Sequence, residues 1–212
     1  MISAHSQIES MSKHLISRML ILLVCICLWG SQAIAGENPL DVVKTGTDQV
    51  IKILKEYPQD TQARREKIRE VVDKYFDYDG VSRLALGPQW NKQPPEKQQE
   101  FSRDFSKLLF GKYIDSIEKY ANQKITYNQK QVTQDHFVVE STVMDQGGPV
   151  HIDYALHLKN GKWGVYDVSV EGLSLVVNYR SQFDQMLASG SFDNVLAMLK
   201  QQVAQVCGSK SC

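Results

Sequence analysis

The sequence predicts an α+β protein in which helices fold over a curved antiparallel sheet of four strands. From residue 38 to residue 122 apolar side chains recur every three or four positions, as in amphipathic helices, and the same spacing returns beyond Gly172. Between these segments the period shortens to two, which is typical of strands with one buried face. We therefore expect helices, then four strands, then two further helices.

The first 35 residues have the composition of a secretory signal peptide. A basic start that includes Lys13 precedes an apolar stretch, residues 19–29, and the small residues Ala33 and Ala35 precede the expected cleavage site. The apolar stretch is too short to cross a bilayer, because a membrane-spanning helix needs about 20 residues. The mature protein is therefore expected to be exported.

The remaining chain is expected to form a single domain, residues 36–206, followed by a short tail, residues 207–212. The tail contains Cys207 and Cys212, which could pair in an oxidising compartment or remain free thiols. The 24 basic and 24 acidic residues balance, so the chain lacks the basic surface that nucleic-acid binding requires. A single apolar run also excludes a polytopic membrane protein.

Two helices are expected before residue 80, and the second begins at Asp60 or Thr61, either of which can cap it. The segment 84–90 contains Gly-Pro, which breaks regular structure, and we expect a loop there. The longest helix should begin at Pro95, because proline at the first helical position loses no useful donor. The last helix should begin after Ser191 as its cap.

Four strands are expected between residues 125 and 170, in an antiparallel meander. Asn160-Gly161 favours a two-residue hairpin turn between the third and fourth strands, because both turn positions require positive φ. In the fourth strand Trp163 and Val165 have one parity, whereas Val168 has the other. The apolar face therefore changes sides near Val165, and a β-bulge or a strong twist is expected there.

The polar residues do not match a known catalytic motif. The chain has no nucleophile elbow, no phosphate-binding glycine loop and no zinc-protease motif. His151 and His157 share a strand face, but six residues of strand separate them by about 20 Å, too far to share a metal ion. Asp167 and Glu171 could act as acid and base, although we expect each to bond a backbone amide or an arginine.

Ordered motifs extend over nearly all of residues 38–202. They include Asn38-Pro-Leu-Asp-Val-Val-Lys44, Ser82-Arg-Leu-Ala-Leu-Gly87, Val150-His-Ile-Asp-Tyr154 and Glu171-Gly-Leu-Ser174. In this order and spacing they resemble the MlaC family of periplasmic phospholipid-binding proteins, also called the toluene-tolerance auxiliary component. The resemblance implies an α+β fold, with helices packed on a twisted four-stranded antiparallel sheet that encloses a lipid pocket.

The resemblance also implies a function, which is the carriage of phospholipid as cargo, without enzymatic activity and without a cofactor. Such proteins exchange lipid with an outer-membrane lipoprotein–porin complex and with an inner-membrane ABC transporter that has an MCE-type subunit. They work in the periplasm and keep the outer leaflet free of phospholipid. A carrier is needed to shield the lipid from water, because exposing a lipid of about thirty methylenes to water costs on the order of 25 kcal/mol.

We expect the pocket to be lined by large apolar residues of the long helix and the sheet. The lining residues expected from face and parity are Phe101, Phe105, Leu109, Tyr113, Tyr154, Leu156, Trp163, Tyr166 and Val168. Leu84, Leu86 and Trp90 are expected at the rim, and Arg83 either approaches the lipid phosphate or holds a carboxylate.

Two other classes of protein remain open from the sequence alone. Helices over a curved sheet also describe small cone-shaped hydrolases and isomerases, in which Asp167 would act at the pocket floor. A pure interaction module would instead use the same apolar residues as a closed core, because composition does not separate a core from a lined cavity.

Overall fold

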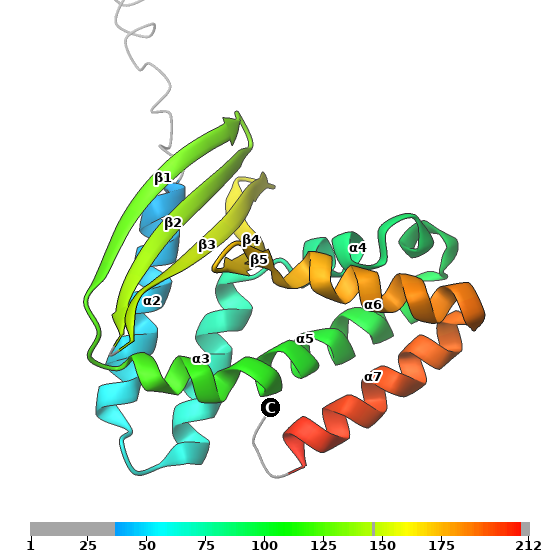
Figure 1. The fold of residues 1–212 in the computed structure, drawn as a ribbon, viewed down its shortest axis with the longest axis horizontal. Coiled ribbons are helices and arrows are strands. Elements are labelled where there is room, and N and C mark those ends of the chain that lie inside the picture. The colour runs from blue at the N-terminus through cyan, green and yellow to red at the C-terminus, as the bar shows by residue number, and fades with distance from the viewer. Residues whose placement is uncertain (1–36, 146, 209–212) are drawn as a thin grey trace, which may run out of the picture. The chain divides into compact units, whose positions relative to one another are not determined.

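The computed structural model describes residues 37–145 and 147–208, which form a curved antiparallel sheet with helices packed beside it (Figure 1). The predicted α+β class is confirmed. The expected signal peptide, residues 1–35, and the end of the tail with Cys212 lie outside the described residues. Cys207 is disulfide-bonded. None of the described helices is both long enough and apolar enough to cross a membrane.

The first two helices are α2 (Pro39–Glu56) and α3 (Thr61–Tyr75), which pack against each other. Asp60 caps α3, because its carboxylate accepts a hydrogen bond from the amide of Ala63 at 3.0 Å. Of the two caps predicted for this helix, the structure therefore selects Asp60.

Helical structure replaces the loop that the sequence predicted over residues 84–90. Helix α4 (Tyr78–Leu86) continues through this segment, and the 3-10 helix η1 (Gly87–Lys92) follows it directly. The prediction was wrong because the Gly-Pro pair changes the type of helix instead of ending helical structure. Gly87 ends the α-helix with a φ of 53°, and Pro88 fits the first turn of the tighter helix.

The longest helix, α5 (Pro95–Ile117), begins at Pro95 as predicted and continues as the 3-10 helix η2 (Glu118–Tyr120). After the sheet come α6 (Leu175–Ser189) and α7 (Phe192–Cys207), and Ser191 caps α7 as predicted. Helix α7 packs along α5, where Lys200 pairs with Glu100. Helices α4 to α7 therefore surround a core of their own.

The sheet contains β1 (Ile125–Thr133), β2 (His136–Asp145), β3 (Gly148–Lys159) and β4 (Lys162–Val170) as the predicted meander. Asn160 and Gly161 have φ values of 52° and 76°, as the predicted hairpin turn requires.

A fifth strand, β5 (Leu173–Ser174), was not predicted, and α6 starts two residues later than expected. Glu171 and Gly172 form a second turn with positive φ, which folds Leu173 back against Val170 before the helix begins.

Of the bulge and the strong twist considered for β4, the structure has a β-bulge, in which Tyr166 is the extra residue. Leu156 pairs with Val165 and Tyr154 pairs with Val168. Two residues of β4, Tyr166 and Asp167, therefore lie opposite one residue of β3, Ala155. Because of this bulge, Val165 and Val168 lie on the same face of the sheet despite their different parity.

A cluster of ion pairs connects α3 to the end of α5. Glu118 contacts the guanidinium groups of Arg64 at 2.9 Å and Arg65 at 2.7 Å, and all three side chains are largely buried. Asp115 also pairs with Arg65, at 2.7 Å. The cluster fixes the carboxyl end of α5, which leads directly into the sheet.

We predict that Glu118→Gln lowers the free energy of unfolding by about 2–4 kcal/mol, because it leaves Arg65 buried with only the exposed Asp115 as counter-charge. Glu56→Gln is the matched control, since Glu56 forms only an exposed pair with Lys52 and should change stability by less than about 1 kcal/mol. Urea unfolding of both variants measures the difference, and equal effects would contradict the assigned role of Glu118.

The effect of Glu118→Gln should depend on pH. Burial raises the pKa of Glu118, but hydrogen bonds and charges from Arg65 and Arg64 outweigh it and hold this pKa below its ordinary value. A carboxylate with a lowered folded-state pKa stabilises the protein fully above its unfolded pKa of about 4.3, and this stabilisation is lost as the pH falls through the folded-state value. The stabilities of variant and wild type should therefore converge in acid.

Candidate functional site

The two faces of the sheet differ in charge. Directly paired residues lie on the same face, so the strand register assigns each residue to a side. The outer face carries Lys130, Glu140 and Asp153. The inner face, which packs against α2, carries no charged side chain except Asp145 at a hairpin end. Its other side chains are Ile125, Tyr127, Gln129, Gln131, Phe137, Val139, Ser141, Val143, Val150, Ile152, Tyr154, Leu156, Leu158, Trp163, Val165, Val168 and Val170.

Helices close only part of this inner face. Val139, Leu156 and Val165 are buried against Val42 and Val43 of α2. In the two cross-strand rows that end at Val168 and Val170 of β4, the apolar residues other than Val139 keep accessible surface. These residues, which we call the open strip, are Tyr127, Ile152, Tyr154, Val168 and Val170.

The phenol of Tyr154 is largely shielded by protein. Burial raises the pKa of Tyr154 to about 12, and the nearby phenols of Tyr127 and Tyr120 add to the effect, while a hydrogen bond with Ser141 opposes it. The Tyr154 side chain nevertheless keeps accessible surface. The phenol is therefore mostly desolvated, although the side chain is not closed off from solvent.

Two further tyrosines connect the long helix to α6. The Tyr179 ring is only 4% exposed and packs edge-on against Phe105, with ring centroids 5.0 Å apart. Burial, together with the nearby Tyr113 phenol, raises the pKa of Tyr179 to about 12. Tyr113 is half-buried, and burial also raises its pKa.

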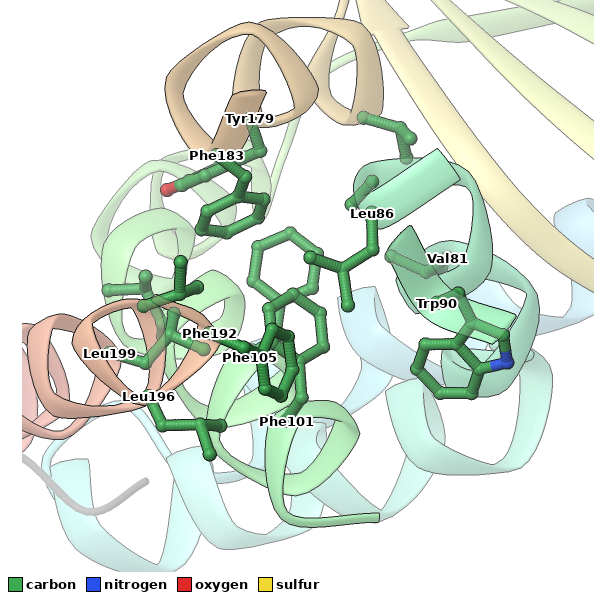
Figure 2. Close-up of a cluster of buried hydrophobic side chains, with 14 residues drawn as sticks. Val81, Leu86, Trp90, Phe101, Phe105, Tyr179, Phe183, Phe192, Leu196 and Leu199 are labelled. Carbon is green, nitrogen blue, oxygen red and sulfur yellow. The ribbon is translucent and has the colours of Figure 1, made fainter. Parts of the chain in front are cut away.

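Four of the residues predicted for the pocket or its rim belong instead to a closed aromatic core, shown in Figure 2. Phe101 is fully buried and contacts Phe183 and Phe192, with centroid distances of 5.3 and 5.9 Å. The prediction that Phe101 and Phe105 face the sheet was wrong, because α6 and α7 fold back over this half of α5 and occupy that side. The four core residues are Leu86, Trp90, Phe101 and Phe105.

The other predicted lining residues divide between the faces of the sheet. Leu156 is fully buried under α2, and Trp163 is half-buried against Phe137. Tyr166 lies on the outer face, where its ring contacts His136 and His157 at 5.9 and 5.1 Å. The expectation that Tyr166 faces inward was wrong, because the residue inserted at the bulge leaves the alternation. The half-buried remainder is Leu109, Tyr113, Tyr154 and Val168.

Arg83 and Leu84 lie on the exposed side of α4. The Arg83 guanidinium lies over the Trp90 ring, 5.6 Å from its centroid, and it pairs with no carboxylate among residues 37–145 and 147–208. Leu84 is 40% exposed. The structural role of Arg83 is thus a cation–π contact and not the carboxylate pair considered from the sequence.

The two carboxylates considered for catalysis bond backbone amides, as expected. Asp167 accepts hydrogen bonds from the amides of Val168 at 2.8 Å and Val176 at 3.1 Å, and from the Ser174 hydroxyl. Glu171 accepts from the amide of His151 at 2.6 Å. Asp167 lies on the outer face, so it does not point toward the open strip.

The outer face has polar features of its own. A depression of about 440 Å³ over β1 to β3 is lined mainly by hydroxyl, carboxylate and imidazole groups, which do not suit an alkyl chain. His157 contacts the Asp77 carboxylate at 2.7 Å, and Lys159 contacts it at 3.3 Å. Burial raises the pKa of Asp77, but the Gly80 amide, His157 and Lys159 outweigh it and lower this pKa. In the part of the chain described, no three potential ligands gather around a metal site.

Sequence reasoning missed several residues around the open strip. Tyr127 and Ile152 follow the strand alternation and could have been found from their parity. Tyr120 and Tyr179 could not, because only the packing of the helices brings them toward the sheet and α5.

The fold and the open strip together define a class of small α+β proteins whose helices leave an apolar, uncharged sheet face partly accessible. The family model for "MlaC protein" matches residues 44–201, and the chain belongs to this family.

Relatives and a solved structure agree with this assignment. The chain is 27% identical over 178 residues to the toluene tolerance protein ttg2D of Pseudomonas putida, covering 80% of this chain and 83% of that protein. It is 21% identical over 183 residues to the intermembrane phospholipid transport system binding protein MlaC of Haemophilus influenzae, covering 82% and 86%. A phospholipid-binding protein from Ralstonia solanacearum, solved with a phospholipid, matches with a TM-score of 0.72 and 28% identity, covering 80% of this chain and 98% of that one.

The distinction between closed core and open strip predicts different costs for neighbouring leucines of α5. Leu108 is fully buried, and Leu108→Ala should lower the free energy of unfolding by about 2–5 kcal/mol. Leu109 is half-buried, and Leu109→Ala should cost only about 1 kcal/mol in lipid-free protein. Chemical denaturation measures both values. A loss at Leu109 as large as at Leu108 would show that Leu109 belongs to the closed core.

Proposed function

We propose that this protein is a phospholipid carrier that covers the acyl chains of its cargo with the open strip and the facing side of α5. The observation that carries the proposal is the uncharged, partly accessible inner face in a chain of the MlaC family. The R. solanacearum protein of similar fold holds a phospholipid, which supports the same cargo here.

The physical requirement for such a carrier is modest. Water opposes the transfer of a free diacyl lipid with a barrier on the order of 25 kcal/mol, and an apolar surface removes most of this barrier. Because a bilayer is as apolar as the protein surface, small differences in affinity then decide which way lipid moves. The residues we propose to contact acyl chains are Leu109, Tyr113, Tyr127, Ile152, Tyr154, Val168 and Val170.

The proposal extends to location and partners. The signal-peptide composition of residues 1–35 supports export to the periplasm. There the protein would exchange phospholipid with an outer-membrane lipoprotein–porin complex and with an inner-membrane ABC transporter that has an MCE-type subunit, as in the MlaC family. The backbone hydrogen bonds of Asp167 favour this non-enzymatic role over a hydrolase or isomerase.

Protein purified without detergent should contain phospholipid in stoichiometric amount. Mass spectrometry of an organic extract, referred to the protein concentration, measures the occupancy and identifies the lipid. Recovery of folded protein without lipid, together with failure to acquire lipid from vesicles, would contradict the proposed function.

Val168→Asp should reduce lipid occupancy at least tenfold, because a carboxylate in the open strip would lose its hydration when acyl chains cover it. Thr142→Asp is the matched control, since Thr142 is also half-buried but lies on the outer face, and it should retain full occupancy. Circular dichroism establishes that both variants are folded. Equal occupancy in both would exclude Val168 from the lipid contact.

A further inference from the structure

Uncharged phenols lie on the inner face of the sheet and on the helices α5, η2 and α6. Tyr127 and Tyr154 contribute phenols from the sheet, and Tyr113, Tyr120 and Tyr179 contribute phenols from α5, η2 and α6. A phenol that keeps its proton donates one hydrogen bond, and burial raises the pKa of Tyr113, Tyr154 and Tyr179, which keeps these three protonated at neutral pH.

Among the described residues, three of these phenols, those of Tyr113, Tyr120 and Tyr179, form no hydrogen bond. The hydroxyl of Tyr154 already interacts with Ser141, and that of Tyr127 with Thr47. Among residues 37–145 and 147–208, the hydroxyls of Tyr113 and Tyr179 form no hydrogen bond. Neither oxygen, however, belongs to the fully buried polar atoms that lack a partner. Both oxygens are therefore accessible.

The position of Tyr179 shows where its hydroxyl points. Its ring is held between Phe105 and Phe183 of the closed core, with centroid distances of 5.0 and 5.9 Å. Figure 2 shows the Tyr179 oxygen pointing away from the centre of that core. Tyr113 lies two turns beyond Phe105 on the same side of α5 and interacts electrostatically with Tyr179. The two phenols are thus near enough to influence each other electrostatically, and Tyr179 lies at the border of the core.

A cargo that covers this pair must supply hydrogen-bond acceptors. Acyl chains remove water without offering a partner, and a polar group that loses water without a partner weakens binding. The body of a diacyl phospholipid carries two ester carbonyls, which are uncharged acceptors. Its phosphate, in contrast, is best bound by arginine or lysine, and the inner face of β1 to β4 has neither.

We propose that the Tyr113 and Tyr179 hydroxyls donate hydrogen bonds to the ester carbonyls of the cargo and so select ester-linked over ether-linked lipids. This inference rests on the proposed function. It assigns the glycerol region of the lipid to the border between the closed core and the open strip, with the acyl chains along the strip.

The test uses two phosphatidylethanolamines with the same chain lengths, one with two ester linkages and one with two ether linkages. Lipid-depleted protein is incubated with vesicles that contain both in equal amounts, then separated, and the bound lipids are quantified by mass spectrometry. One net hydrogen bond corresponds to about a fivefold change in affinity, so wild-type protein should bind the diester at least fivefold better.

The double variant Tyr113→Phe/Tyr179→Phe should lose this preference, with a ratio near one, while it still binds the diether lipid. Tyr166→Phe is the matched control, because Tyr166 lies on the outer face, and it should keep the wild-type ratio.

A wild-type ratio near one, or an unchanged ratio in the double variant, would overturn the assignment of these two hydroxyls while leaving the carrier function intact. Loss of the preference in Tyr166→Phe would overturn it as well, since the ratio would then not report on Tyr113 and Tyr179. Failure of wild-type protein to load either lipid would overturn the proposed function and this inference together.

Discussion

A sheet face that carries no charge except Asp145 at a hairpin end, and that the helices do not fully cover, is the constraint on which the rest of the structure depends. Helix α2 covers the part of the face around Leu156, but the apolar side chains of the open strip keep surface in contact with solvent. Apolar surface gains about 25 cal/mol per Å² when it leaves water, so the strip favours any apolar partner that fits it. The charged residues of the outer face give that side of the same strands no such preference.

The helices do not close the strip because their own large side chains pack elsewhere. Phe101 and Phe105 of α5, with Phe183 of α6 and Phe192 of α7, form a core among the helices. This core, to which Leu86 and Trp90 also contribute, buries the largest side chains of these helices without any residue of the sheet. The protein can therefore leave an apolar surface partly uncovered without losing the packing that holds the helices together, which a single shared core would not permit.

Local chemistry made much of the fold predictable. Turn and cap residues determine the structure only of the few residues next to them. The structure agrees with the three that were used, Asn160-Gly161, Pro95 and Ser191. An irregularity near Tyr166 was also predictable, since the change of parity in β4 indicates a bulge or a strong twist, and the structure has the bulge. The long apolar stripe of α5 was different, because periodicity shows that a helix face is buried but not which element buries it. Its first half packs on α6 and α7, and only Leu109 and Tyr113 keep accessible surface near α6.

Tyrosine suits the wall of such a surface for a reason that concerns charge. A lysine or aspartate there would have to be desolvated each time acyl chains entered, at a cost far above the differences in affinity that direct lipid exchange. A phenol whose pKa is raised stays neutral, and it presents an apolar ring together with one donor. Tyr154, whose pKa of about 12 keeps it protonated, can thus contact hydrocarbon without opposing either entry or release. Neutral polar groups allow a carrier to distinguish lipids while its affinity stays close to that of the membranes it serves.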